Sequence, residues 1–392
     1  MSLSQLPLSY CTNVHAGQTV AEVEAGLDRY TVAVKERFGQ PLAAGLWLAN
    51  PVVNEIQQTP DGARRFADRL MKRGLTCHTL NAFPYGDFHS ARVKENVYLP
   101  DWKGNERFLY TMACARVLVT LLQDQNEGSI STLPLGFKGF ARSFSPYFIR
   151  GASASLIDAA LTLKGIHEVT GKLIRLAIEP EPLCVLETTA EAIEFFGKLR
   201  QQASEIPGAE EAVRTHIGLC YDICHQAVEF EDVAESIRAL DEADIRINKV
   251  HISCALQIDH PADNADGRAA LRRYVEPRYL HQTTARTLMG TIVRETDLSE
   301  AFIANPPRPF LEAAAWRIHF HVPVNAHHMG PLSTTRSDLI MALTEVANLD
   351  YAPDLEVETY TWEVLPGAQE RDLVEGLSRE LTSTAKLISE ID

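Results

Sequence analysis

The chain has 392 residues, of which 45% are hydrophobic and 23% are charged, and its formal net charge is −15 at pH 7. This composition is that of an ordinary globular protein with a large core. The acidic excess argues against nucleic acid as a partner, because binding a phosphate backbone takes clustered Lys and Arg. No run of about 18 apolar residues occurs, so no membrane span is predicted. A small-molecule partner is expected, and the sequence leaves a homo-oligomer open.

The cysteines and the N-terminal segment indicate a cytoplasmic protein. The seven cysteines are scattered through apolar segments without zinc-finger spacing, and an odd number in a long chain is typical of reduced thiols. Only Cys220 and Cys224 lie close together, and their CxxxC spacing is not a redox motif, so buried structural thiols are expected. Residues 1–11, MSLSQLPLSYC, lack the basic and apolar regions of a secretory signal.

Short apolar runs alternate with longer amphipathic segments along the chain. Helical spacing of apolar residues, or a capping box, predicts helices in 20–37, from Thr188 onward, near 233–240, near 339–346 and in 368–390. Strands are predicted in nine segments: 8–17, 42–50, 75–86, 128–137, 173–182, 216–225, 247–254, 317–324 and 355–362. Such alternation is typical of parallel strands joined by helices, and eight such units close into a (β/α)8 TIM barrel.

Nine strands are one more than the barrel needs. Segment 256–316 contains DHPADNADGR, EPRYLHQT and NPPRPF without a clear rhythm of strands and helices. We interpret it as an insertion after the seventh strand, within a single domain that spans 1–392. Either 317–324 belongs to this elaboration, or one of the early strands is not a barrel member.

Carboxylates and imidazoles lie at or near the ends of several predicted strands. They are Glu179, Glu181, Asp222, His225, His251, His319, His321 and Glu358. The carboxyl ends of barrel strands are where active sites form, and oxygen and imidazole ligands without thiolate suit Zn, Mn, Fe or Co. Each residue alone has a structural explanation, as a hydrogen-bonded His or as a carboxylate that caps a helix. One shared site explains all eight at once, so the sequence predicts a centre for one to three divalent ions.

These residues also carry a resemblance to the xylose-isomerase-like TIM-barrel superfamily, which includes sugar isomerases, sugar epimerases and endonuclease IV. In its ketose 3-epimerase branch a ligand Glu is followed six residues later by a second Glu, which Glu181 and Glu187 resemble. A ligand Asp precedes a His by three residues, as Asp222 precedes His225 in DICH. The last ligand of the branch is a Glu on the final strand, which Glu358 in EVETYTW resembles.

Endonuclease IV adds a His on the seventh strand and an acidic-x-His pair, which His251 and the HFH at 319–321 resemble. Here His319 stands where that pair has Asp, which leaves its role open. The combined pattern favours four residues as principal ligands and three others as secondary ligands. The principal four are Glu181, Asp222, His251 and Glu358, and the others are Glu179, His225 and His321.

At a finer level the chain is similar to the EboE family over nearly its full length. The similar segments are YCTNVHAG, NAFPYGDFH, VYLPDW, IEPEPLCVLET, YDICHQAVEFE, YLHQT, HFHVPV and EVETYTW. Proteins of that family are encoded in operons linked to metabolite traffic and resemble sugar phosphate isomerases. The resemblance implies a site but brings no known reaction.

Further side chains are expected to bind substrate at the barrel mouth: His15, His78, Asn81, Glu187, His319 and Lys94. Lys94 would meet a phosphate or carboxylate, or else be an ordinary surface lysine. Aromatic residues such as Phe83 and Tyr85 would stack on a sugar or an apolar ligand, or pack in the core.

Three functions remain open at this point. The favoured one is an isomerase or epimerase acting on a small polyol or sugar-like metabolite, in which a metal-bound hydroxy-carbonyl loses a proton. Its candidate catalytic residues are Glu181, Glu358 and His225. The second is a metal-dependent hydrolase or phosphodiesterase of the endonuclease IV type, which two or three ions would favour. The third is a metabolite-binding or carrier protein without turnover, and fold analogy alone does not choose among them.

Overall fold

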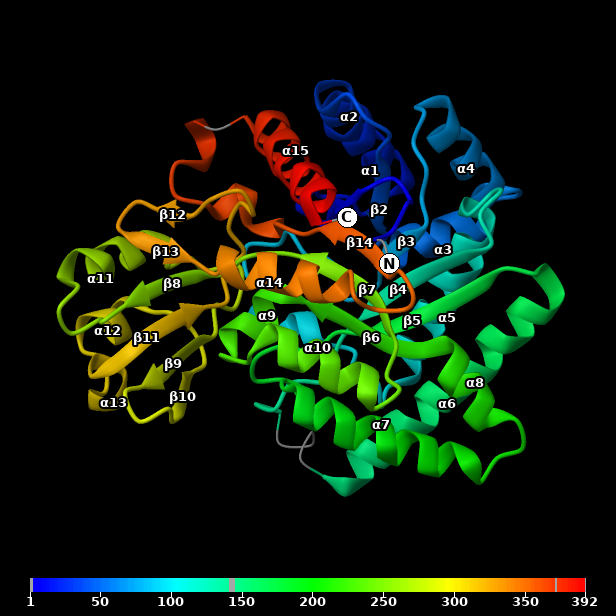
Figure 1. The fold of residues 1–392 in the computed structure, drawn as a ribbon. Helices are drawn as coiled ribbons and strands as arrows, with labels where there is room; N and C mark the ends of the chain where they lie inside the picture. Colours follow the sequence, from blue (N-terminus) through cyan, green and yellow to red (C-terminus); the bar gives the residue numbers. More distant parts are fainter. Residues whose placement is uncertain (1–2, 141–144, 371, 392) are drawn as a thin grey trace.

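The computed structural model describes residues 3–140, 145–370 and 372–391 (Figure 1). Eight parallel strands form a closed barrel in the order β1-β14-β7-β6-β5-β4-β3-β2. The strands are β1 (Ser9–Cys11), β2 (Ala43–Trp47), β3 (Thr79–Asn81), β4 (Glu127–Thr132), β5 (Leu173–Ile178), β6 (Ile217–Asp222), β7 (Ile247–Ile252) and β14 (Asp354–Val357). The predicted TIM barrel is therefore confirmed.

Helices connect the strands and cover the outside of the barrel (Figure 1). They are α1 (Val20–Gly26), α2 (Val32–Phe38), α3 (Asn50–Gln58), α4 (Gly62–Lys72), α5 (Asn105–Leu121), α6 (Pro146–Thr170), α7 (Thr189–Ser204), α8 (Ala209–His216), α9 (Ile223–Val228), α10 (Val233–Glu242), α14 (Arg336–Val346) and α15 (Leu373–Ile391). A π-helical turn, η2 (Leu27–Thr31), joins α1 to α2, so the helix predicted over 20–37 is one rod. The predicted capping box of Thr188 and Glu191 begins α7.

A second sheet lies between β7 and β14 in the sequence and beside the barrel in space, drawn from green to orange in Figure 1. Its strand order is β10-β9-β11-β8-β13-β12. The inserted elements are β8 (Leu256–Asp259), α11 (Ala265–Leu271), η5 (Arg272–Tyr274), β9 (Thr283–Thr287), β10 (Ile292–Glu295), α12 (Glu300–Ala304), α13 (Arg308–Leu311), β11 (Ala313–Ile318), β12 (His328–Met329) and β13 (Leu332–Thr334).

This sheet accounts for the ninth predicted strand. Segment 317–324 begins in the last two residues of β11, which pairs with β8 and β9 rather than with a barrel strand. The first of the two alternatives is therefore correct. The inserted sheet extends to Thr334, past residue 316, where the sequence pattern had placed its end.

The interior of the barrel holds a buried ion pair. Lys249 Nζ lies 2.7 Å from Glu356 Oε1, and neither side chain is exposed to solvent. A Cβ atom at position 45 would lie 1.4 Å from Glu356 Oε2, so the glycine there leaves room for this carboxylate. His251 and Glu358 follow Lys249 and Glu356 by two residues and share their inward face, because side chains alternate along a strand. The ion pair therefore lies directly beneath the strand ends.

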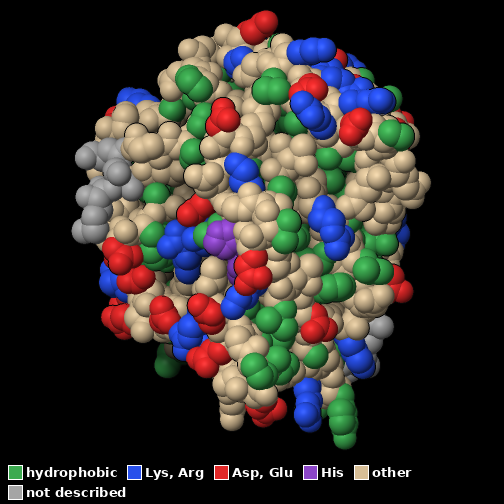
Figure 2. All heavy atoms as spheres, turned by 90° about the vertical axis from the view of Figure 1, so that its right-hand side faces the viewer, with side chains coloured by type: hydrophobic (Ala, Val, Ile, Leu, Met, Phe, Trp, Pro, Cys, Tyr) green, Lys and Arg blue, Asp and Glu red, His purple; other side chains and the backbone are tan. Residues whose placement is uncertain are grey.

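On the face shown in Figure 2, basic and acidic side chains are interspersed over most of the surface. Within the described part of the chain, none of the helices combines the length and the apolar character that crossing a bilayer takes. All seven cysteines lie in the described part, buried and not joined in disulfides.

Candidate metal centre

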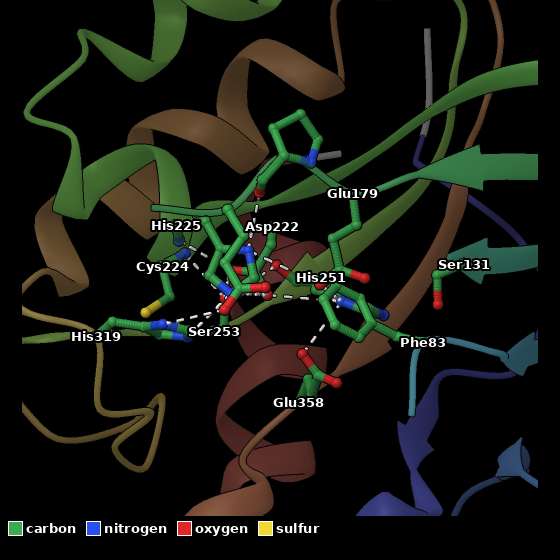
Figure 3. A network of polar contacts seen from close by, with 12 residues as sticks. Phe83, Ser131, Glu179, Asp222, Cys224, His225, His251, Ser253, His319 and Glu358 are labelled. Carbon is green, nitrogen blue, oxygen red and sulfur yellow. Dashed lines mark hydrogen bonds and ion pairs between the residues drawn. The ribbon is translucent and has the colours of Figure 1, made fainter. Parts of the chain in front are cut away.

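Four neighbouring strands bring one acidic or imidazole side chain each to the carboxyl end of the barrel. Parallel pairing sets Asp222 of β6 beside His251 of β7, while Glu179 follows β5 and Glu358 follows β14. We call Glu179, Asp222, His251 and Glu358 the ligand group. Each offers one ligand atom, and these atoms all lie within 4.8 Å of one another. Figure 3 shows the other members lying around His251.

The distances within the ligand group fit a divalent cation. His251 Nδ1 lies 3.0 Å from Glu179 Oε1, 3.1 Å from Glu358 Oε2 and 3.5 Å from Asp222 Oδ2. Glu179 Oε2 and Asp222 Oδ2 are buried without a hydrogen-bond partner in the described part of the chain. Buried carboxylates need a compensating positive charge. Three carboxylates and one imidazole are a ligand set that suits a divalent transition metal.

Asp222 is a helix cap and a ligand candidate at once. Its Oδ1 accepts hydrogen bonds from the His225 backbone N, at 3.0 Å, and from Ser253 Oγ, at 2.7 Å. This arrangement begins α9 and fixes the carboxylate plane. Oδ2 is thereby turned toward His251. Asp222 can therefore cap α9 with Oδ1 and bind an ion with Oδ2.

Glu358 is oriented by two side-chain amides, Asn13 after the neighbouring strand β1 and Asn81 at the end of β3. Its Oε1 accepts hydrogen bonds from Asn13 Nδ2, at 2.9 Å, and from Asn81 Nδ2, at 3.1 Å. Oε2 therefore faces His251. Asn81, expected to bind substrate, contacts a member of the ligand group, and Asn13 acts in the same way.

A second group consists of three imidazoles, His225, His319 and His321, which we call the histidine group. In each ring Nδ1 faces an oxygen acceptor: Pro180 O at 3.0 Å, Gln282 Oε1 at 2.8 Å and Glu358 O at 2.9 Å, respectively. A neutral imidazole that donates from Nδ1 presents a lone pair at Nε2. Burial lowers the pKa of His225 to about 4 and the pKa of His319 well below its usual value, which keeps both rings neutral.

These Nε2 lone pairs gather in one place. The Nε2 atoms of His225 and His319 are 3.0 Å apart, and those of His225 and His321 lie 3.9 Å and 4.0 Å from Asp222 Oδ2. Two facing lone pairs at 3.0 Å need a cation or a proton between them. Two overlapping sets here fit a second ion, Asp222 with His225 and His321, and Glu181 with His225 and His319, and their nitrogen ligands are typical of zinc.

Glu181 lies outside the ligand group, but it forms another candidate metal-binding set with His225 and His319. Its Oε1 accepts a hydrogen bond from Tyr98 OH at 2.6 Å and lies 3.4 Å from Gln282 Nε2 and 3.5 Å from His319 Nδ1. The sequence pattern favoured Glu181 as a principal ligand and Glu179 as a secondary one, whereas the structure places Glu179 with Asp222, His251 and Glu358. Burial raises the pKa of Glu179 to about 7 and the pKa of Glu181 well above its usual value.

The remaining residues expected at the barrel mouth have other neighbours. His15 Nε2 contacts Tyr10 OH at 2.9 Å, and its ring stacks on Tyr30. Glu187 binds Lys138 Nζ at 2.7 Å and the Leu183 backbone N at 2.6 Å. Neither His15 nor Glu187 lines the cavity above the ligand group.

His78 and Lys94 also differ from the expectation. His78 directly precedes β3, so it lies toward the amino end of the barrel, away from the ligand group. Lys94 lines the cavity, but its ammonium is engaged by the protein itself, with Asp297 Oδ2 at 2.7 Å.

Several residues at the site carry no strong sequence signal. Gln282 and Tyr279 come from the insertion, and Tyr360 from the segment after β14. Tyr98 lies in η3 (Lys94–Tyr98), a short turn without periodicity. The segments VYLPDW, YLHQT and EVETYTW contain all four of these residues, so family resemblance was the one available signal.

The fold is shared with solved structures, whereas no family model and no curated protein matches the sequence. A xylose isomerase-like TIM barrel protein from Mycobacterium smegmatis, in complex with magnesium, superposes with a TM-score of 0.53 at 11% identity, over 100% of this chain and 99% of that one. The IOLI protein with a bound zinc atom gives 0.50 at 12% identity, over 99% of both chains. A xylose isomerase domain protein from Planctomyces limnophilus gives 0.50 at 12%, over 98% of this chain and 96% of that one. At such identities the likeness shows the fold.

Proposed function

We propose that this protein is a metal-dependent isomerase or epimerase acting on a small metabolite that carries adjacent hydroxyl and carbonyl groups. The observation that supports this most directly is the ligand group, with the separate carboxyl group of Glu181 lining the same cavity. The shared fold adds support, since two of the similar structures are described with zinc or magnesium. The metal of this protein is proposed to be Zn, Mn, Fe or Co.

A divalent ion bound by the ligand group would act as a Lewis acid on the substrate oxygens and make the adjacent C–H more acidic. Glu181 would accept that proton. Tyr98 and Gln282 hold its Oε1 in place, and burial, which raises its pKa above the usual value, makes the carboxylate a stronger base. The electron pair of the C–H bond would form the C=C bond of an enediolate.

Glu358, held by Asn13 and Asn81 on the other side, would pass a proton from solvent to carbon, while Glu181 releases its own proton to solvent. Return to the opposite face of the same carbon gives an epimer, and return to the neighbouring carbon gives an isomer. In both cases one proton leaves carbon and one returns, and the isomer also requires the hydroxyl proton to move between the two oxygens, so no external oxidant or reductant is needed. His225, the third candidate catalytic residue, contacts His319 and has its Nδ1 held by Pro180, which suits a ligand better than a proton carrier.

Exchange of substrate hydrogen with solvent deuterium tests this proposal. α-Hydroxy ketones and ketoses are incubated with the Mn-, Co- or Zn-loaded protein in D2O. We expect hydrogen at the carbon next to the carbonyl to exchange for deuterium, which NMR measures. Glu181→Gln should abolish exchange while keeping its metal, and Glu179→Gln should lose the metal itself. Absence of exchange with every ketose and polyol tested would contradict the proposed reaction.

The histidine group favours a second candidate, a metal-dependent hydrolase. Two ions that share Asp222 would clamp the attacking and leaving oxygens of a hydrolysed ester. Elemental analysis should then give two metals per chain, and His321→Ala should lower this to one while the ligand group stays filled. Hydrolysis of bis(p-nitrophenyl) phosphate by the two-metal form, without ketose exchange, would decide for the hydrolase.

Membership in the EboE family, with a role in metabolite traffic, belongs to the same proposal and is supported by the segments that resemble that family, while a cytoplasmic location is supported by the cysteine pattern. A carrier function is distinguished by its stoichiometry. Mass spectrometry of the purified protein would then show one captured metabolite per chain, with no turnover of that metabolite on prolonged incubation.

A further inference from the structure

The cavity above the ligand group has a polar floor and an apolar wall. The floor is made by Glu179, Glu181, Glu358, His225 and His319 together with Asn13 and Asn81. Phe83, Phe88, Val97, Tyr279, Leu280 and Tyr360 form much of the wall. A ligand that fills the cavity therefore needs a polar part at the floor and an apolar part at the wall.

Three rings of the wall are packed against one another before any ligand arrives. Phe88 lies 4.9 Å from Tyr279 and 5.5 Å from Tyr360, and Tyr279 lies 5.0 Å from Tyr360, between ring centroids. They come from the loop after β3, from the insertion and from η6 (Tyr360–Val364). Since each ring is fixed by the other two, the wall presents a preformed apolar surface.

The wall offers no free positive charge among the described residues that line it. Lys94 is the one Lys or Arg of that lining, and its ammonium donates to Tyr279 O at 2.6 Å, to Asp297 Oδ2 at 2.7 Å and to Glu276 O at 3.0 Å. An ammonium has three donors, so this group has none left for a ligand.

From this arrangement, which rests on the proposed function, we infer the substrate class: an adjacent hydroxyl and carbonyl attached to an uncharged hydrocarbon body, without a phosphate. The head group meets the polar floor, and the body, an aromatic or alicyclic ring, lies against Phe88, Tyr279 and Tyr360. At the wall a phosphate would be buried without a partner cation, because the ammonium of Lys94 is engaged, and the ring faces of Phe88, Tyr279 and Tyr360 offer no hydrogen bonds to the hydroxyls of an open sugar chain.

Four simple ligands test the inference by binding alone. Hydroxyacetone, 2-hydroxyacetophenone, dihydroxyacetone and dihydroxyacetone phosphate are titrated into the metal-loaded protein by calorimetry. We expect 2-hydroxyacetophenone to bind at least about tenfold more tightly than hydroxyacetone, and the phosphate no more tightly than dihydroxyacetone. Equal affinity for the first two, or a phosphate preference of tenfold or more, would overturn the inference.

Two variants probe the wall itself. Phe88→Ala should remove most of the preference for 2-hydroxyacetophenone, while Tyr147→Ala, whose ring is 81% exposed and outside the cavity, should leave it intact. Val97→Lys adds a cation at a half-buried position of the wall and should reverse the selectivity toward dihydroxyacetone phosphate. Melting temperature and metal content identify a variant that has not folded.

The deuterium-exchange assay separates failure of this inference from failure of the proposed reaction. Selective binding of 2-hydroxyacetophenone without exchange of any ketone would contradict the isomerase and leave the substrate class standing. Exchange of all ketones without selectivity would contradict the substrate class and leave the reaction standing.

Discussion

At the scale of single residues, the imidazole of His251 is held on both sides of its ring. Its Nδ1 faces Glu179 and Glu358, while its Nε2 lies 3.3 Å from Glu356 Oε1. A ligand imidazole commonly gives its second N–H to a carboxylate, which fixes the tautomer and the ring plane. Burial acts to raise the pKa of Glu356, but Lys249 and His251 hold it at about 2. Glu356 is therefore an anion at ion-pair distance from the His251 ring.

The ion pair of Lys249 and Glu356 gives a stability prediction. Lys249→Met leaves Glu356 ionised in the barrel interior without its main cation, and losing one partner of a buried pair costs about 3–5 kcal/mol. Urea denaturation should show this loss for the single variant and a much smaller loss for Lys249→Met combined with Glu356→Gln. A single variant within about 1 kcal/mol of the wild type would contradict the assignment.

At the scale of elements, Lys94 joins the loop after β3 to the insertion. Its backbone N and that of Val93 donate to Arg278 O, both at 2.8 Å, in addition to the three bonds of its ammonium. The loop and the insertion thus form one wall of the cavity, although 182 residues separate Lys94 from Glu276 in the sequence.

Lys94→Met tests this structural role against the expected role in substrate binding. Loss of the ammonium leaves buried oxygens unpaired, so we expect a destabilisation of about 2–3 kcal/mol and faster proteolysis near residues 272–281. Metal content should not change. Unaltered proteolysis combined with weaker ligand binding would instead favour direct substrate contact.

The closing helix α15 carries a buried carboxyl group, Glu380. It accepts hydrogen bonds from Thr359 Oγ1 and the Val324 N on Oε1, and from Trp362 Nε1 on Oε2. Burial raises its pKa to about 7. The folded protein therefore holds a proton that the unfolded chain releases near pH 4.5, and stability falls as pH rises from there to about 7.

Glu380→Gln should remove this pH dependence. Relative to the variant, the wild type should lose about 3 kcal/mol of unfolding free energy between pH 4.5 and pH 7.5, which chemical denaturation at several pH values would measure. Because other buried groups titrate equally in both proteins, the difference between the two curves isolates Glu380. Parallel curves would contradict a raised pKa.

The sequence predicted the regular elements well, because they depend on local patterns. Apolar periodicity located α10 and α14, and Thr188 with Glu191 located the start of α7. The strand at 317–324 was ambiguous, because an apolar run has the same appearance in an antiparallel insertion as in a barrel. Only pairing with β8 and β9 distinguishes them, and pairing is not local.

At the scale of the whole molecule, the composition of the site also depends on tertiary contacts, which local sequence patterns do not predict. The sequence predicted that carboxylates and imidazoles meet at the strand ends, and the structure brings together Asp222, His251 and Glu358. It could not separate Glu179 from Glu181, since both precede prolines two residues apart. Tyr98, in a turn far away in the sequence, donates a hydrogen bond to Glu181 Oε1. This tertiary contact holds Glu181 outside the ligand group.

Removal of metal should destabilise the whole protein. Glu179, Asp222 and Glu358 gather buried acidic groups that repel one another without a cation, so an ion binds the folded state much better than the unfolded one. At an ion concentration of roughly a thousand times its Kd, linkage gives about 4 kcal/mol, or a shift of about 5–10 °C. Calorimetry with and without EDTA measures the shift, and an unchanged melting temperature would contradict a bound ion.

The hydrogen bond between Asn13 and Glu358 joins residues 345 positions apart. Synthesis on the ribosome proceeds from the amino end, so Glu179, Asp222 and His251 emerge long before the residue that completes their set. Until β14 has emerged and paired with β1 and β7, the barrel is open and three of the four ligands have no fixed positions. Loading of the proposed metal would therefore follow translation, and the ion would be acquired from whatever pool surrounds the protein after barrel closure.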